Sequence, residues 1–166
     1  MKTNDVDCFP KGRIMDKTTF QNRVLAAEQL LYRVSKTLLK RDEDCADAVQ
    51  EAILKAWSAL PTLREERYFT TWLTRILINE CYAILRRNER ITDIEAIPET
   101  AAPERSFSSL YEALTALPEK TRVAVELHYI EGYSVAEVAE ILKIPEGTVK
   151  SRLSGGRKLL KRFLEE

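Results

Sequence analysis

The chain has 166 residues, among them 26 basic and 26 acidic side chains, one histidine and three cysteines. This length allows one globular domain or two small ones, and 45% hydrophobic residues exclude wholesale disorder. No apolar run approaches the roughly 20 residues that span a bilayer, and the N-terminus lacks a secretory signal, so we expect no membrane insertion. Cys8, Cys45 and Cys81 show no metal-binding spacing, which favours a reduced, cytoplasmic setting.

A net charge of zero conceals a strong segregation of charge along the chain. Residues 42–51 contain five acidic side chains and no basic one, whereas residues 147–162 contain six basic side chains and no acidic one. Opposite charge on separate segments predicts two different partners for two different faces.

Apolar residues recur every three or four positions in the N-terminal half, which predicts helices over residues 20–39, 42–60 and 68–87. Residues 1–19 form a loose arm without periodicity. Residues 91–106 are rich in acids and contain two prolines, so they predict a flexible acidic linker. No segment alternates long enough for a strand. We therefore expect an all-α chain of two small helical domains, over residues 20–90 and 107–166.

The C-terminal half carries the pattern of a helix-turn-helix. After helices over residues 107–117 and 118–129 comes a turn at 131–133, and Ser134 with Glu137 forms a capping box before a short helix at 135–142. Pro145 suits the first turn of a last helix that runs to about Leu164. Val149, Leu153, Leu160, Phe163 and Leu164 are expected to face inward. A glycine pair at 155–156 predicts a bend or fraying of this helix beyond Ser154.

The last helix is expected to lie in the major groove of DNA with its N-terminal residues leading. Small and cationic side chains there suit contacts with phosphates and guanine edges, and the alternative is a solvated basic face. The candidate DNA-binding residues of the helix-turn-helix are Ser134, Glu146, Gly147, Thr148, Lys150, Ser151, Arg152, Arg157 and Lys158.

A second face of the helix at 68–87 mixes cations, aromatic rings and an amide at helical spacing. Such a face suits unpaired DNA, because bases stack on aromatic rings while arginine neutralises phosphate. The alternative is that the aromatic residues belong to the core and are edged by arginines. The candidates are Trp72, Arg75, Asn79, Tyr82 and Arg86, with Arg64, Arg67 and Tyr68 in the preceding loop as a weaker site for a flipped base.

The acidic helix is expected to expose Asp47, Gln50, Glu51 and Leu54, with Glu51 and Lys55 able to pair at i,i+4. This surface is poor for DNA and suits a basic protein helix, and the alternative is an ordinary solvated face. His128 has no companion residues for catalysis, and Cys45 and Cys81 fall on apolar faces.

Three stretches together resemble the extracytoplasmic-function (ECF) group of bacterial RNA polymerase sigma factors. They are residues 44–57 (DCADAVQEAILKAW), 69–87 (FTTWLTRILINECYAILRR) and 117–153 (LPEKTRVAVELHYIEGYSVAEVAEILKIPEGTVKSRL), in the order of the family. The resemblance implies a region 2 bundle of three to four helices and a region 4 helix-turn-helix. It also implies binding of core polymerase through its β′ clamp and β flap.

The resemblance assigns a role to each candidate surface. Core binding falls on Asp47, Gln50, Glu51, Leu54 and Lys55, recognition and melting of the minus-ten element on the second face of the helix at 68–87, and the minus-thirty-five element on the helix-turn-helix. An anti-sigma factor is a further implied partner. The chain departs from the family pattern at Ala83, where the family often has an acid, and at Lys143, where it often has glycine.

Two other classes of function remain as alternatives. An autonomous operator-binding regulator would use the same helix-turn-helix, usually as a dimer. An enzyme would need a metal held by the acids of 42–51, but no second carboxylate cluster accompanies them, and no phosphate-binding glycine-rich loop is present. We therefore expect a binding protein that is not an enzyme and uses neither cofactor nor metal.

Overall fold

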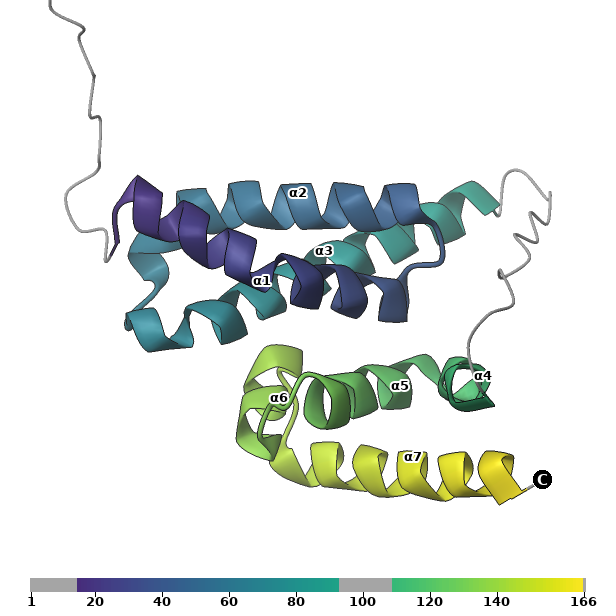
Figure 1. Ribbon diagram of the computed structural model, residues 1–166. Coiled ribbons are helices and arrows are strands. Elements are labelled where there is room, and N and C mark those ends of the chain that lie inside the picture. Colours follow the sequence, from purple (N-terminus) through teal and green to yellow (C-terminus); the bar gives the residue numbers. More distant parts are fainter. Residues whose placement is uncertain (1–14, 93–108, 166) are drawn as a thin grey trace, which may run out of the picture.

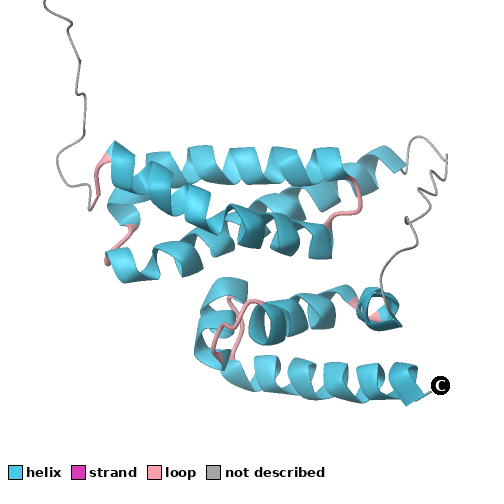
Figure 2. Ribbon diagram, in the orientation of Figure 1, coloured by secondary structure: helices cyan, strands magenta, loops and turns pink. Residues whose placement is uncertain are grey.

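The computed structural model describes residues 15–92 and 109–165, and every regular element in these two stretches is helical (Figures 1 and 2). The predicted all-α fold of two helical domains is thereby confirmed. Most of the predicted arm and linker lies outside the described residues. None of the described helices is long and apolar enough to cross a membrane.

The N-terminal half is a bundle of three helices, α1 (Lys17–Leu38), α2 (Asp42–Ala59) and α3 (Phe69–Thr92). At the start of α1 the Asp16 carboxylate accepts a hydrogen bond of 2.7 Å from the backbone N–H of Thr19, an ordinary N-cap. The core side of α2 consists of small, fully buried residues, which lets α3 pack closely against it. These residues are Cys45, Ala48, Ala52 and Ala56.

The segment before α3 and the C-terminal end of α3 both differ from the sequence prediction. Two short 3-10 turns, Leu60–Thr62 and Glu66–Tyr68, occupy the segment predicted as a polar loop. At its other end α3 continues to Thr92 rather than stopping at Arg87, so the first residues of the predicted linker are helical. Charged side chains at 86–90 therefore project from a regular helix.

The C-terminal half contains α4 (Ser109–Ala116), α5 (Glu119–Val125), α6 (Val135–Leu142) and α7 (Glu146–Glu165). A π-helical turn, Glu126–Ile130, extends α5, and its backbone closes with a 3.0 Å hydrogen bond from Glu131 N–H to the Glu126 carbonyl. The predicted helix to Tyr129 is thus an α-helix followed by a wider turn. Such turns are uncommon and are frequent at functional sites.

Both ends of α6 follow from local chemistry. The Ser134 hydroxyl accepts from the Glu137 N–H at 3.2 Å, and the Glu137 carboxylate accepts from the Ser134 N–H at 2.8 Å, which confirms the capping box. At the other end Lys143 adopts the left-handed conformation with φ of 53°, where glycine is preferred. Pro145 directly precedes α7, and its carbonyl accepts hydrogen bonds from the Thr148 and Val149 N–H groups.

The glycine pair does not interrupt α7, which corrects the expected bend or fraying. The helix is continuous from Glu146 to Glu165 (Figure 1). Gly156 is buried against α5, and a Cβ there would lie 2.7 Å from Cγ2 of Val125 and 3.2 Å from Cγ2 of Thr121. Gly156 therefore allows close approach of α5 and α7, and this packing outweighs its low helix propensity.

The C-terminal end of α7 is more exposed than its periodicity predicts. Val149 and Leu153 are buried, as expected. Phe163 and Leu164, which were expected to face inward, are 49% and 53% exposed. Leu160, also expected to face inward, is partly buried against the core, so burial ends before the last turn of α7 although the apolar pattern continues.

The two halves pack against each other, with α1 and α3 of the N-terminal bundle facing α5 and α6 (Figure 1). Buried residues of both halves form one continuous hydrophobic cluster. On α3, Leu73 belongs to this cluster, and its neighbour Thr74 is a polar residue that is also fully buried.

Candidate nucleic-acid and protein interfaces

The leading residues of α7 form an open surface. Glu146, Gly147, Lys150 and Ser151 are exposed, while Val149 between them is fully buried and fixes the helix to the core. A Cβ added at Gly147 would meet nothing within 4 Å, so the space beside this backbone is empty. This end of the helix can therefore approach a flat or convex ligand without rearrangement.

The other predicted residues of the helix-turn-helix are either engaged within the chain or lie further along α7. Thr148 and Arg152 are half-buried, and the Ser151 hydroxyl donates to the Thr148 carbonyl at 3.0 Å. Ser134 serves the start of α6 through its capping contacts. Arg157 and Lys158 are exposed on the unbroken part of α7 that follows Gly156. Arg157 and Lys158 therefore lie on the same continuous helix as Arg152.

The second face of α3 is partly occupied within the chain. Trp72 packs beside Phe69 with ring centroids 6.0 Å apart, and Tyr82 is also packed against the core, as the alternative of core aromatic residues predicts. Arg75 is half-buried and forms a 3.0 Å ion pair with Glu140 of α6. By contrast, Asn79 is exposed and open to solvent.

The segment before α3 offers exposed cations beside an aromatic ring. The Arg67 guanidinium lies 4.7 Å from the centroid of the Tyr68 ring and pairs with Glu65 at 2.8 Å. Arg64 and Tyr68 are exposed. These residues can stack on and neutralise a nucleotide.

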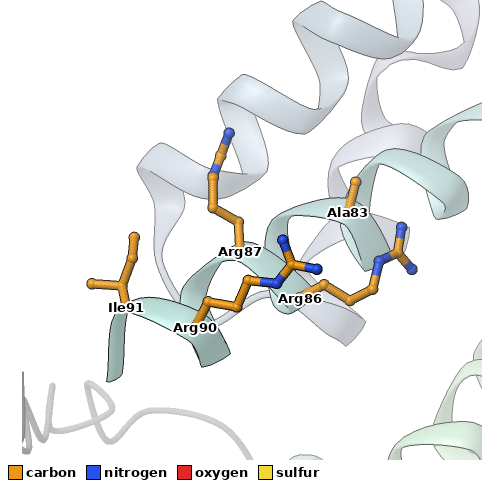
Figure 3. Close-up of a pocket in the computed structure, with 5 residues that line it drawn as sticks. All are labelled: Ala83, Arg86, Arg87, Arg90 and Ile91. Atoms are coloured by element: carbon orange, nitrogen blue, oxygen red, sulfur yellow. The ribbon is translucent and has the colours of Figure 1, made fainter. Parts of the chain in front are cut away.

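A cationic groove near the end of α3 was missed by the sequence reading. It has a volume of about 380 Å³ and is lined by Ala83, Arg86, Arg87, Arg90 and Ile91 (Figure 3). Only Arg86 was a candidate, because the helix was expected to end at Arg87. Continuing the helical spacing beyond Arg86 reaches Arg90 at i+4, and this was the signal available in the sequence. Three guanidinium groups beside apolar surface suit phosphate oxygens.

The acidic helix α2 exposes the predicted surface. Asp47, Gln50 and Glu51 are exposed, and Leu54 is 63% exposed. The expected Glu51–Lys55 pair is long at 3.9 Å, because the Lys55 ammonium pairs more closely with Glu80 of α3 at 2.7 Å. The hydrogen bond with Glu80 raises the pKa of Lys55. Lys55 is thus held by Glu80, and the other exposed charges of this surface, Asp47 and Glu51, are negative.

The other acids at the start of α2 have partners within the chain. Asp42 pairs with Lys36 at 2.7 Å and accepts a hydrogen bond from the Tyr32 hydroxyl, and these contacts lower the pKa of its carboxyl. Asp44 accepts from the Asn88 side chain at 3.1 Å. Across the described residues no group of three or more His, Cys, Asp or Glu side chains is arranged to hold a metal ion.

The histidine and the described cysteines have structural surroundings. The half-buried His128 ring donates from Nδ1 to the Tyr133 carbonyl at 2.7 Å. Cys45 and Cys81 are buried, and burial raises the pKa of the Cys81 thiol to about 12. A thiol with this pKa is a poor nucleophile at neutral pH. Cys8 lies outside the described residues.

Comparison with known families accounts for both halves. Residues 24–91 match the family described as sigma-70 region 2, and residues 107–160 match sigma-70 region 4. The ECF RNA polymerase sigma factor SigM of Mycobacterium tuberculosis is 31% identical over 154 residues, covering 90% of this chain and 79% of the relative. The ECF RNA polymerase sigma-E factor of Escherichia coli is 33% identical over 137 residues, covering 70% and 72%.

Solved structures share the same architecture. The sigma factor RpoE of Bartonella quintana, in complex with the anti-sigma factor NepR, superposes with a TM-score of 0.77 at 26% identity, covering 89% of this chain and 98% of that one. CnrH, in complex with the cytosolic domain of CnrY, has a TM-score of 0.67 at 22% identity and covers 90% of each chain, which supports the fold.

A helix-turn-helix, whose last helix begins with exposed residues and is rich in cations, beside a helical bundle with an acidic outer helix, is the architecture of a DNA-binding protein. The matches to region 2 and region 4, together with relatives that span most of the chain, identify its family. The chain belongs to the ECF group of the sigma-70 family.

Proposed function

We propose that this chain binds core RNA polymerase and directs it to specific promoters for DNA-templated transcription initiation. The match of both halves to sigma-70 regions, in the order of that family, carries this conclusion. We infer that it works by binding energy alone, as an initiation factor that makes and breaks no covalent bond. Because its proposed partners are polymerase and promoter DNA, we place its action in the cytoplasm.

We assign region 2 to residues 20–90, the linker to 91–106 and region 4 to 107–166. In this division the open face of α2 binds the β′ clamp through Asp47, Gln50, Glu51 and Leu54, with Lys55 fixed at its edge. The negative charge and the exposed Leu54 support a basic, partly apolar protein partner. Region 4 supplies the second contact with polymerase, at the β flap.

We assign the minus-ten element to α3 and the segment before it. Trp72 and Tyr82 offer rings for unpaired bases, Asn79 an amide for base edges, and Arg64, Arg67 with Tyr68 a stacking and neutralising corner. We add Arg87 and Arg90 to Arg86 as phosphate contacts, because all three line one groove. Arg75 joins this surface once its contact with Glu140 is released.

We assign the minus-thirty-five element to the helix-turn-helix. Lys150 and Arg152 reach phosphates or guanine edges, and Thr148 and Ser151 donate to phosphates. Gly147 allows the backbone to come close to DNA, with Ser134 and Glu146 at the border of the contact. The exposure of Lys150 and Ser151 on a helix fixed by Val149 supports this assignment. Arg157 and Lys158 add contacts further along the groove wall.

We further propose that an anti-sigma factor binds this chain. The Bartonella quintana sigma factor, which shares this fold at 26% identity, was solved with an anti-sigma factor. A partner of this kind would cover the surfaces assigned to polymerase and thereby hold the chain inactive.

Run-off transcription tests the proposed function. Purified chain, added to sigma-free bacterial core enzyme on genomic fragments, should produce discrete transcripts that core enzyme alone does not make. Footprinting without polymerase should give little protection, whereas an autonomous operator-binding regulator would protect DNA equally well without it. Absence of both transcripts and core association would contradict the proposal.

A further inference from the structure

The turn that joins α6 to α7 contains a residue whose side chain does not suit its backbone (Figure 1). Lys143 has φ of 53° and ψ of 49°, and within residues 15–92 and 109–165 it is the one non-glycine residue with a positive φ. A Cβ is disfavoured in this left-handed conformation, and glycine is the common residue at such a helix end. The backbone therefore gains nothing from lysine here, and any advantage of Lys143 lies in its side chain.

Hydrogen bonds on both sides hold this turn in place. The backbone N–H groups of Lys143 and Ile144 donate to the Ala139 carbonyl, the second at 3.1 Å. Ile144 is packed against the core, and the Pro145 carbonyl accepts from the Val149 N–H at 3.2 Å in the first turn of α7. The backbone of Lys143 is thus fixed relative to the leading end of α7, while its long side chain can adjust.

The Lys143 ammonium has no charged partner among the described residues. Lys143 is exposed, and it lies with Arg75, Glu140 and Glu146 along a groove of about 610 Å³. Arg75 and Glu140 pair with each other at 3.0 Å, whereas Lys143 takes part in none of the ion pairs that the described parts of the chain form. Its charge is therefore available to an anion outside the chain.

This charge lies between the two helices of the helix-turn-helix. In that motif the first helix crosses the DNA backbone, and the second enters the major groove with its N-terminal residues leading. Because α6 ends at Leu142 and α7 begins at Glu146, Lys143 lies where the phosphates that border the groove would pass. An ammonium on a flexible stem is a point charge, which suits a single phosphate without a fixed orientation.

We propose that Lys143 is a phosphate contact of the helix-turn-helix, which holds promoter DNA at the edge of the major groove whatever the base sequence there. The inference rests on the proposed function and adds one residue to the surface assigned to the minus-thirty-five element. Phosphate contacts fix the position of a protein on the duplex but carry no sequence information. Lys143 therefore strengthens binding to different promoters by the same factor.

Three variants separate the charge of Lys143 from its backbone conformation. Lys143→Gln keeps the Cβ and most of the stem but removes the charge, Lys143→Arg keeps a charge, and Lys143→Gly removes the charge and relieves the backbone. The matched control is Lys120→Gln, at an exposed lysine of α5. Each full-length variant is assembled with core polymerase, and binding to two fluorescent promoter fragments of unrelated sequence is measured between about 0.05 and 0.2 M salt.

The phosphate contact predicts a loss that depends on salt and not on sequence. Lys143→Gln should weaken binding about fivefold at about 0.1 M salt on both fragments, and the slope of log affinity against log salt should become shallower by about 0.9. Lys143→Gly should lose as much although its fold is relieved of strain, whereas Lys143→Arg and Lys120→Gln should bind like the unmodified chain. Association with core enzyme, measured separately, should be equal in all of them.

Several results would overturn the assignment of Lys143. They are an unchanged affinity and salt slope in Lys143→Gln, an equal loss in Lys120→Gln, and a loss restricted to one of the two fragments. Weaker binding with an unchanged slope would show that Lys143 acts only on the end of α6, where a cation also favours the helix dipole. Failure of the proposed function is separately visible, because the unmodified chain with core enzyme would then bind neither fragment.

Discussion

The two surfaces assigned to DNA differ in what they contact in the free chain. The leading residues of α7 face solvent, with Lys150 and Ser151 exposed and the neighbouring Val149 buried in the core. The corresponding face of α3 is half-occupied, with Arg75 paired to Glu140 and Tyr82 close to Arg152. One surface is ready to bind, whereas the other first has to be uncovered. Duplex recognition and strand capture thus have different conformational requirements in one chain.

The largest effect is expected at Gly156, where α7 packs against α5. Gly156→Ala places a methyl group 2.7 Å from Cγ2 of Val125 and 3.2 Å from Cγ2 of Thr121, so the packing of α5 against α7 must shift. We expect the free energy of unfolding to fall by about 2 kcal/mol, measured by urea denaturation followed by circular dichroism. Gly155→Ala is the matched control, because nothing lies within 4 Å of its added Cβ. It should stabilise the helix by up to about 1 kcal/mol, and equal effects of both variants would refute the packing role of Gly156.

The next effect separates the two DNA surfaces directly. Lys150→Ala removes an exposed cation with no compensating gain, so promoter-specific transcription should fall about tenfold. Arg75→Ala removes a proposed DNA contact but also the pair with Glu140, so transcription should fall only about threefold. Both are measured by run-off transcription at fixed core concentration, with Lys120→Ala on the exposed part of α5 as the neutral control. A larger loss for Arg75→Ala than for Lys150→Ala would reverse the comparison.

A smaller, pH-dependent effect is expected at the contact between the two halves, beside Arg33 and Glu131. Burial and the neighbouring Glu131 together raise the pKa of Glu126 to about 7, against the opposing effect of Arg33. Among the charged groups of the neighbouring elements, Arg122 contacts two carbonyls, Glu137 the cap of α6, and Glu140 the side chain of Arg75. Separation of the halves exposes Glu126 and lowers its pKa, so the closed form binds more protons.

The sign of the pH effect follows from this difference. The contribution of Glu126 to closure is fully present below pH 4.5 and is lost as pH rises towards 7. Because part of Glu126 remains in water, we expect the ratio of packed to separated halves to fall about threefold between pH 5.5 and 8. Energy transfer between dyes on cysteines introduced at positions 29 and 161 measures this ratio. Glu126→Gln should flatten this dependence, and an unchanged slope in that variant would assign the pH response to another group.

The smallest effect is expected at the turn between α6 and α7. Lys143 stands in the left-handed region with φ of 53°, so Lys143→Gly should relieve backbone strain. After the entropic cost of glycine in the unfolded chain, a gain of about 0.5 kcal/mol in the free energy of unfolding remains. Thermal denaturation measures it, and Lys143→Ala, which keeps the Cβ, should bring no such gain. Stabilisation by alanine as well would exclude the backbone explanation.

Much of the fold was predictable from the sequence because helices leave a local signal. The apolar period located α1, α2 and α3, and the pair Ser134 and Glu137 fixed the start of α6. Periodicity says which side of a helix is apolar but not whether a neighbour covers it. Phe163 and Leu164 therefore fit the pattern and are nevertheless exposed.

The contacts between the halves could not be predicted in the same way. The Arg33–Glu131 pair joins residues far apart in the sequence, and no spacing rule relates them. Gly156 was read by its low helix propensity, whereas its environment is decided by Val125 on another helix. Candidate surfaces for DNA and polymerase could be proposed from the charges along each helix. Whether another part of the same chain covers such a surface depends on the tertiary packing, as the pair of Arg75 with Glu140 shows.

The division of labour between α2 and α7 is tested most directly by measuring core binding and run-off transcription in parallel for two variants. Lys150→Ala should bind core enzyme like the unmodified chain yet initiate poorly. Glu51→Lys, which reverses a charge on the exposed acidic face, should lose core binding about tenfold and lose initiation with it. Equal loss of core binding by both variants, or unchanged core binding by Glu51→Lys, would contradict the assignment of separate surfaces to polymerase and promoter.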